Sequence, residues 1–150
     1  CALPICSGGK GGDTARSIGF EWTPEGLETL YLKSKVLIDV RAANVPYPMS
    51  GGWMDILNLE GLRALAIQLK QLGYTGMHLI HPSHVPVVNE VFSPSPEDVK
   101  HWQGLVAAME EMRATGGAAV TFDGDMVDIA HEATARTMLA IAKEMGVEGA

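Results

Sequence analysis

The sequence has 150 residues, a formal net charge of −7 and a hydrophobic content of 47%. This balance predicts a globular chain with a core of its own, and it argues against nucleic acid and anionic membranes as partners, since both require a basic face. No apolar run approaches the roughly 18 residues of a membrane span. Cys1 and Cys6 are the only cysteines, too few for a disulfide framework, so a reducing cytoplasm is the expected compartment.

The first third of the chain contains a glycine-rich stretch and two expected elements. Residues 7–14 lack the Gly-Lys-Ser/Thr sequence of a P-loop, and they fit either a linker or backbone that approaches a ligand closely. Thr23 and Pro24 predict the start of a helix that runs to about Ser34. The near-continuous apolar centre of Lys35–Ala43 predicts a buried strand of a parallel sheet.

The middle of the chain predicts a helix, a turn, a buried strand and a polar loop. Asp55 and Asn58 are candidate caps for a helix over residues 59–72, whose leucines recur at spacings of three and four. A strand is expected over residues 76–81, ending where Pro82 removes a backbone donor. This order is typical of an α/β protein, in which strand C-termini face the site. Residues 81–84 are therefore the first place to look for chemistry.

The last third predicts a long helix, a hairpin and a final helix. Ser95, Pro96 and the acidic residues after them mark a helix start, and Gly116-Gly117 mark its end. A strand is expected over residues 118–122, followed by a hairpin-type turn at Asp123-Gly124. The final helix should run from about Ile129 to Met145.

Several side chains are candidates for chemistry, each with a structural alternative. His78, His81 and His84 do not form a convincing zinc set, because a strand would point the first two to opposite faces; His81 alone is the better ligand-facing candidate. Asp13 is either a turn residue or one carboxylate of a magnesium site. Asp128, directly before a helix, is at least an N-cap, and the acidic turn around it lacks the pattern of a calcium loop.

Five segments, taken together and in order, resemble the citrate lyase beta subunit-like family of acyl-CoA lyases, also described as HpcH/HpaI-type. They are Gly11-Gly12-Asp13 with Gly19, residues 55–62 (DILNLEGL), residues 76–85 (GMHLIHPSHV), residues 88–95 (VNEVFSPS) and residues 122–128 (FDGDMVD). The family includes citryl-CoA, malyl-CoA and citramalyl-CoA lyases and a malyl-CoA thioesterase.

The resemblance implies an α/β fold. The chain would supply the C-terminal half of a TIM (β/α)8 barrel, from about the fifth strand, as residues 1–92. Residues 93–150 would add a helix, a hairpin and a lid helix. The family's first half, with a partner glutamate and a substrate-binding arginine, would lie outside this sequence, and the chain alone would then be inactive.

The resemblance also implies a reaction and its residues. An Mg²⁺-dependent acyl-CoA lyase would cleave a β-hydroxyacyl-CoA to acetyl-CoA and an oxo-acid; a thioesterase and an inactive binding fragment are the alternatives. Asp13 would hold the metal, residues His81, Pro82 and Ser83 would lie near the acyl-CoA, and Asp128 would be the acid/base. A homo-oligomer, trimer or hexamer, would place each lid over a neighbouring subunit, in the cytoplasm or the mitochondrial matrix.

Overall fold

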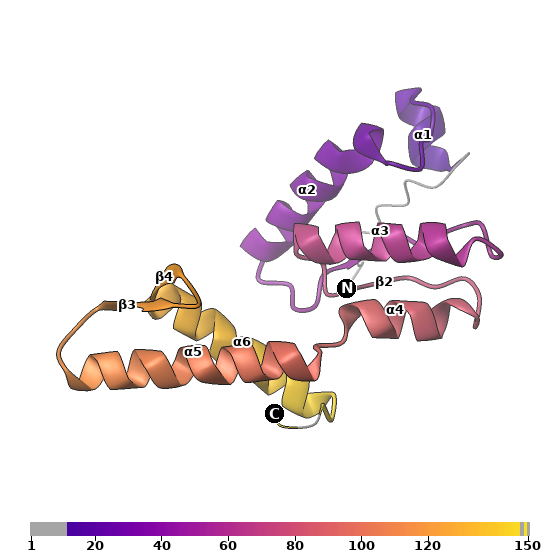
Figure 1. The fold of residues 1–150 in the computed structure, drawn as a ribbon. Helices are drawn as coiled ribbons and strands as arrows, with labels where there is room; N and C mark the ends of the chain where they lie inside the picture. Colours follow the sequence, from indigo (N-terminus) through magenta and orange to yellow (C-terminus); the bar gives the residue numbers. More distant parts are fainter. Residues whose placement is uncertain (1–11, 148, 150) are drawn as a thin grey trace. The chain divides into compact units, whose positions relative to one another are not determined.

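The computed structural model describes residues 12–147 and 149, and the chain divides into two compact units, residues 1–92 and 93–150 (Figure 1). Each unit has a hydrophobic cluster of its own. The cysteines and most of the glycine-rich stretch lie outside the described residues. No helix in the part that is described combines the length and the apolar composition needed to cross a membrane.

The first unit is built from helices around a short parallel strand pair. Its elements are α1 (Asp13–Ile18), α2 (Leu27–Ala42), β1 (Met49–Ser50), α3 (Leu59–Leu72), β2 (Gly76–Met77) and α4 (His84–Phe92). β1 and β2 pair in parallel, with Met49 opposite Gly76 and Ser50 opposite Met77. Because α3 connects two parallel neighbours, β1, α3 and β2 form a βαβ unit, the building block of α/β folds. The α/β prediction holds for this unit.

Helix α3 follows its sequence pattern closely. Asn58 is the N-cap, and its side-chain oxygen accepts a 2.9 Å hydrogen bond from the backbone N–H of Gly61. The buried face consists of Leu62, Ala66 and Leu69, which recur at helical spacing. Gly73 ends the helix with φ at 105°, a left-handed conformation that glycine adopts without a Cβ clash.

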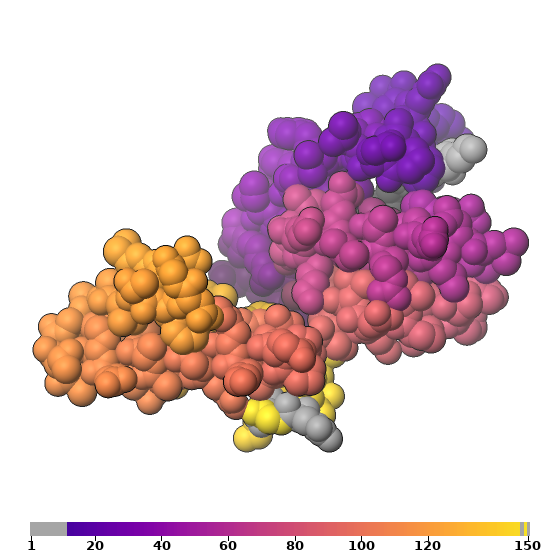
Figure 2. Space-filling model, viewed as in Figure 1, coloured from indigo at the N-terminus to yellow at the C-terminus, as the bar shows by residue number. Residues whose placement is uncertain are grey.

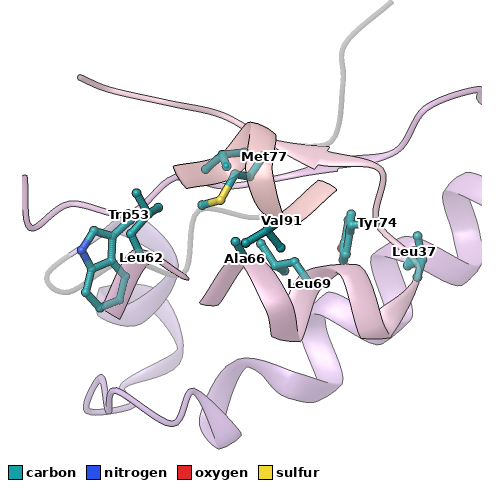
Figure 3. Close-up of a cluster of buried hydrophobic side chains, with 9 residues drawn as sticks. Leu37, Trp53, Leu62, Ala66, Leu69, Tyr74, Met77 and Val91 are labelled. Atoms are coloured by element: carbon teal, nitrogen blue, oxygen red, sulfur yellow. The ribbon is translucent and has the colours of Figure 1, made fainter. Parts of the chain in front are cut away.

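The core of the first unit lies along α3 (Figure 3). Trp53 packs near Leu62 at one end, and Tyr74 and Leu37 lie at the other. The Tyr74 hydroxyl donates a 2.9 Å hydrogen bond to the carbonyl of Lys33, which fastens α2 to the end of α3. The core therefore holds α2 and α3 together, and the first turns of these two helices flank the loop after β1.

The strand predicted over Lys35–Ala43 is wrong, because α2 continues through it to Ala42. The buried residues Thr29, Lys33, Leu37 and Val40 recur every three or four positions, so the segment buries one helical stripe. Ile38 is 63% exposed, which shows that the apolar run is not covered on both sides. An exposed Lys35–Asp39 ion pair at i, i+4 also suits a helix.

Two predicted boundaries also shift. Thr23 is not the N-cap of α2; the helix begins at Leu27 after Gly26, and both the backbone N–H and the hydroxyl of Thr23 donate to the Glu28 carboxylate. The strand predicted over residues 76–81 is only Gly76–Met77. Its partner β1 is equally short, and a ladder cannot extend beyond its partner, although His78 N–H still donates to Ser50 O at 3.0 Å.

The second unit contains α5 (Pro96–Ala114), β3 (Ala119–Phe122), β4 (Asp125–Asp128) and α6 (Ile129–Glu144). These elements confirm the predicted helix, hairpin and final helix. Ser95 and Asp98 form a reciprocal capping box at the start of α5. Asp123 and Gly124 both have positive φ, 52° and 93°, as a type I′ hairpin turn requires.

The core of the second unit lies between α5, α6 and the hairpin. Leu105, Met109, Val127 and Ala135 are its buried members, and Phe122 packs against them. In Figure 2 the hairpin atoms, in orange, cover part of the surface of α5. The hairpin and both helices therefore share one core, so that the end of β4 is held at a fixed place relative to α6.

The half-barrel itself remains a prediction. In the described residues the strands form one parallel pair and one antiparallel pair, and no closed barrel is present. The βαβ unit agrees with one repeat of a (β/α)8 barrel, but the strand pair is too short to define barrel closure.

Candidate functional site

Asp128 stands where β4 passes directly into α6. The hairpin register pairs Phe122 with Asp125 and Ala119 with Asp128, so the tight turn fixes which residue reaches the helix start. Asp128 is the N-cap of α6, and its Oδ1 accepts hydrogen bonds from the backbone N–H groups of Ala130 at 2.9 Å and His131 at 3.3 Å. The capping function predicted for Asp128 is therefore present.

The Asp128 carboxylate is accessible and charged. Its side chain is 49% exposed, and His131 Nδ1 lies 2.8 Å from Oδ1. The hydrogen bond from the His131 side chain, followed by those from the backbone N–H groups of His131 and Ala130, lowers the pKa of Asp128. The carboxylate is therefore ionised at neutral pH and accessible at the surface of the second unit.

A small pocket adjoins this corner. It has a volume of about 340 Å³ and is lined by His101, Leu105, Phe122, Asp123, Asp125, Met126, Val127 and His131. His101 Nδ1 lies 2.9 Å from Asp123 Oδ2, so these two groups are paired with each other. His131 thus faces both Asp128 and a pocket that carries further acidic groups.

The predicted acyl-CoA contact residues His81, Pro82 and Ser83 form an exposed turn after β2. His81 Nδ1 lies 2.8 Å from the Ser83 hydroxyl and accepts a 3.2 Å hydrogen bond from the Ser83 backbone N–H. His84, by contrast, is fully buried at the start of α4. The turn therefore presents His81 and Ser83 to solvent while His84 belongs to the interior.

Asp13 is the first residue of α1 rather than a loop residue. Its side chain is 93% exposed, and its Oδ1 accepts a 2.8 Å hydrogen bond from Arg16. Residues 12–147 and 149 contain no group of three or more His, Cys, Asp or Glu side chains that could hold a metal ion. Mg²⁺ is commonly held by one or two carboxylates and several waters, so the chemistry of Asp13 fits one ligand of such an ion.

Sequence reasoning missed a pocket in the first unit. It has a volume of about 460 Å³ and lies between the first turns of α2 and α3 and the loop after β1. Trp22 and Trp53, with ring centroids 5.5 Å apart, form an aromatic wall. Lys33, Asp55 and Asn58 supply polar groups. Its sequence signal was Gly51-Gly52-Trp53 directly after a strand, since strand C-termini face the site in α/β folds.

Glycines allow the close packing around this pocket. A Cβ on Gly61 would lie 2.4 Å from Cζ2 of Trp53, and a Cβ on Gly52 would lie 2.6 Å from the carbonyl oxygen of His78. The indole of Trp53 can therefore rest directly on the first turn of α3. The lining of the pocket includes neither Asp13 nor the His81–Ser83 turn.

Curated relatives of known description match most of the chain. The chain is 34% identical over 119 residues to the mitochondrial citramalyl-CoA lyase of Homo sapiens. This match covers 79% of the chain and 35% of the human protein. The chain is 33% identical over 131 residues to a (3S)-malyl-CoA thioesterase of Cereibacter sphaeroides, covering 87% and 46%. The beta subunit of citrate lyase from Haemophilus influenzae is 30% identical over 131 residues, covering 87% and 45%. The chain thus spans less than half the length of these relatives.

The fold is also that of a solved member. The structure of CitE from Mycobacterium tuberculosis in complex with magnesium, acetoacetate and coenzyme A matches with a TM-score of 0.65 and 28% identity, over 89% of this chain and 46% of that one. No family model matches the sequence. The ordered motifs and these relatives together show that, over the segment it shares with them, the chain belongs to the citrate lyase beta subunit-like family.

Proposed function

We propose that the chain is part of a magnesium-dependent acyl-CoA lyase. The substrate class is a β-hydroxyacyl-CoA such as malyl-, citramalyl- or citryl-CoA, and the products are acetyl-CoA and an oxo-acid. The observation that carries the proposal is the similarity to CitE, a relative solved with magnesium and coenzyme A. The human relative, named citramalyl-CoA lyase, supports the same reaction class.

Asp128 is proposed as the acid/base of this reaction. In cleavage, the ionised carboxylate would take the proton of the hydroxyl, the carbon–carbon bond would break, and the carboxyl group would return this proton to the terminal carbon of the acetyl-CoA enolate. In condensation the same carbon loses that proton. An exposed carboxylate with a lowered pKa is ionised at neutral pH and can accept this proton. The carboxylate is also held by the backbone of α6, so it needs little reorganisation to react.

Asp13 is proposed as a magnesium ligand. Its accessible oxygen atoms are the hard donors that Mg²⁺ prefers. When bound, the metal would supply Lewis-acid polarisation of the oxygen of the hydroxy- or oxo-acid. Arg16 competes for the same carboxylate and has to release Oδ1 if that oxygen becomes a ligand.

The acyl-CoA is proposed to contact the first unit. The proposed contact is the exposed turn of His81, Pro82 and Ser83. The His81 ring and the Ser83 hydroxyl hold each other in place by a hydrogen bond, and both present polar atoms to an acyl-CoA chain. The aromatic pocket after β1 is a second proposed contact surface. Coenzyme A carries a flat adenine and a flexible apolar stem, and both kinds of group pack well against aromatic rings. The half-buried ring of Trp22 is the proposed contact for such groups, since the Trp53 ring is buried in the core.

Thioester hydrolysis is the second candidate, favoured by the 33% identity to a malyl-CoA thioesterase over 131 residues. The two reactions differ in their products. A lyase releases acetyl-CoA and an oxo-acid from malyl-CoA or citramalyl-CoA, whereas a thioesterase releases free coenzyme A and the intact hydroxy-acid. An inactive fragment that only binds or assembles would release neither.

The experiment incubates the full-length protein with each of the two CoA esters and Mg²⁺. Oxo-acid is measured by hydrazone formation and free thiol by a thiol reagent. We expect oxo-acid without free thiol, and loss of the signal when the metal is chelated. Free thiol without oxo-acid would replace the lyase by the thioesterase, and neither product from either ester would contradict both.

The assembly and the compartment are part of the same proposal. We propose a homo-oligomer, a trimer or hexamer, in which the second unit acts as a lid over a neighbouring subunit. The mammalian relatives are described as mitochondrial, which agrees with a mitochondrial matrix location as an alternative to the cytoplasm.

A further inference from the structure

His131 makes two contacts with Asp128 through a single ring nitrogen. Its Nδ1 lies 2.8 Å from Oδ1 of the Asp128 carboxylate and 3.2 Å from the backbone nitrogen of the same residue. The side chain of His131 is 55% exposed and that of Asp128 is 49% exposed. Both the His131 ring and the Asp128 carboxylate are therefore open to solvent protons.

These two contacts require opposite states of Nδ1. A protonated Nδ1 donates to the Asp128 carboxylate, whereas an unprotonated Nδ1 accepts from the Asp128 backbone N–H. One proton thus decides which hydrogen bond forms. When Nδ1 carries a proton, Oδ1 of Asp128 accepts a third hydrogen bond, from the His131 ring. When Nδ1 carries none, Oδ1 accepts only from the two backbone N–H groups of α6.

The surroundings of His131 carry both signs of charge. His101 on α5 and Asp123 and Asp125 on the hairpin line the same 340 Å³ pocket. His101 and Asp123 are paired with each other, so Asp125 is the second acidic group that faces the pocket. Glu132, the next residue of α6, is held by Arg113 and Arg136.

We propose that His131 is a positioning residue for Asp128, and that its protonation sets how readily Asp128 accepts a proton from substrate. This inference rests on the proposed function, in which Asp128 exchanges a proton with the terminal carbon of acetyl-CoA. A cationic His131 stabilises the carboxylate and makes it a weaker base. When His131 loses its charge, the carboxylate becomes the stronger base, so proton removal from acetyl-CoA accelerates as pH rises through the range, about pH 5 to 8, where histidines change charge.

A purely structural role is the competing explanation. His131 occupies the third helical position of the capping box, where glutamine or glutamate is usual. His131→Gln keeps an acceptor for the Asp128 backbone N–H and a donor for its carboxylate, but it cannot carry a charge. If His131 only caps the helix, this variant should behave as the wild type does at every pH.

The experiment measures exchange of the acetyl-CoA methyl protons for deuterium, by NMR, in the full-length protein from about pH 5.5 to 9. Wild type should show a rise of about tenfold across the histidine range, corresponding to a change of about one unit in the pKa of the base. His131→Gln should be flat there, with an unchanged melting temperature. His101→Gln is the matched control, because it removes a titrating ring from the same pocket without a contact to Asp128, and it should keep the rise.

A His131→Gln profile that overlays the wild type overturns the inference. A second measurement does not depend on turnover: in protein labelled with ¹⁵N-histidine, Asp128→Asn should shift the NMR signal of His131 Nδ1, which contacts Asp128, and leave the signals of His101 in place. An unmoved His131 Nδ1 signal would also overturn the inference. Failure of the proposed function is separate. Asp128→Asn that still catalyses exchange removes Asp128 from the reaction, whatever the ring signals show.

Discussion

At the scale of single residues, the carboxylate of Asp128 caps α6, and we propose that it also has a chemical task. Oδ1 accepts three hydrogen-bonding contacts, two from backbone N–H groups and one involving His131. Oδ2 is the oxygen that remains for a reacting proton. This division would allow a helix cap to serve also as the proposed acid/base, since the capping contacts orient the group through Oδ1 alone.

Asp128→Asn should separate these tasks. Asparagine is as good an N-cap as aspartate, so the melting temperature should change little, whereas an amide cannot accept the proton and turnover should fall by roughly two to four orders of magnitude. Turnover of the CoA ester and thermal unfolding of the full-length protein are the measurements. Asp125→Asn is the matched control in the same hairpin and should retain activity. Near-normal turnover of Asp128→Asn would remove the acid/base role.

Asp13→Ala should abolish Mg²⁺-dependent turnover in the full-length protein and leave its folding intact. The side chain is almost fully exposed, and its i, i+3 ion pair with Arg16 adds little stability at the surface. The carboxylate therefore matters chiefly if it holds metal. Turnover is measured against Mg²⁺ concentration, with Asp39→Ala as the control for loss of an exposed, ion-paired aspartate. Retained magnesium-dependent activity would make Asp13 a helix-start residue only.

The sequence could predict the cap at Asp128 but not its partner. Aspartate before an apolar helical run is a common signal of a helix start. The tight turn at Asp123-Gly124 fixes how many residues separate the turn from Asp128. A histidine at the third helical position is outside the usual capping-box pattern, so His131 carried no signal of its own. Its role depends on the rotation of one side chain, which spacing does not specify.

At the scale of elements, helices with caps and periodic apolar faces were predictable, and α2 shows where such reading stops. Its second half, Lys35–Ala42, is apolar enough to suggest a strand, and only the burial of one stripe identifies it as helix. The loop after β1 carries the signal Gly51-Gly52-Trp53, but its shape as a pocket wall depends on Trp53 resting on Gly61 in α3. That contact is tertiary, so the local signal marks the loop without giving the shape of the pocket.

Gly61→Ala should therefore be destabilising, although alanine normally favours a helix over glycine by roughly 1 kcal/mol. The added Cβ would lie 2.4 Å from the buried Trp53 ring, and such overpacking typically costs about 1–3 kcal/mol. The free energy of unfolding is measured by urea denaturation with Trp fluorescence. Gly76→Ala is the control, since its Cβ would meet Met49 at an ordinary 3.7 Å. A more stable Gly61→Ala would show that the indole does not pack there.

Glu132 ties α6 to α5 and should make stability pH-dependent. Its side chain is 5% exposed and accepts hydrogen bonds from Arg136 and Arg113. The Arg136 hydrogen bond, then that of Arg113, lowers the pKa of Glu132 against the opposing effect of desolvation. A carboxyl group with a lowered pKa stabilises the fold above its ordinary pKa, and this stabilisation is lost as pH falls through the lowered value.

Glu132→Gln should accordingly melt at a lower temperature than wild type at pH 7, and the difference should shrink in acid as the wild-type carboxyl is protonated. Melting temperatures from pH 3 to 7 test this. Glu110→Gln removes an exposed partner of Arg136 and should have a small effect throughout. A constant difference at all pH values would show that packing, rather than charge, accounts for the loss.

At the scale of the whole molecule, the order of elements was largely predictable and the closed architecture was not. Helix α3 and the α5–hairpin–α6 arrangement follow from local signals such as Asn58, Ser95 and Asp123-Gly124, whereas the first strand of the βαβ unit, β1, was not predicted. A barrel, however, is defined by how many strands meet and with what stagger, and the described strands comprise two short pairs. The candidate residues Asp13 and Asp128 also lie in different units, so the cooperation that we propose for them would depend on assembly rather than on local sequence.

Mixing two inactive variants tests whether the second unit acts on a neighbouring subunit. Asp13→Ala protein keeps an intact Asp128, and Asp128→Asn protein keeps an intact Asp13. If each site takes Asp13 from one subunit and Asp128 from the next, random assortment in a closed ring leaves about one quarter of the sites with both residues intact. If each site is built from one chain, no site is complete and the mixture stays as inactive as its components.

We therefore expect a mixture of the two full-length variants, dissociated and reassembled together, to recover about a quarter of the wild-type turnover. The recovery should fall when either variant is in excess, because complete sites need one chain of each kind. Subunit exchange is shown separately, by mass spectrometry of oligomers that carry different tags. An exchanged but inactive mixture would restrict each lid to its own subunit, and it would leave the roles of Asp13 and Asp128 to be judged by their single substitutions.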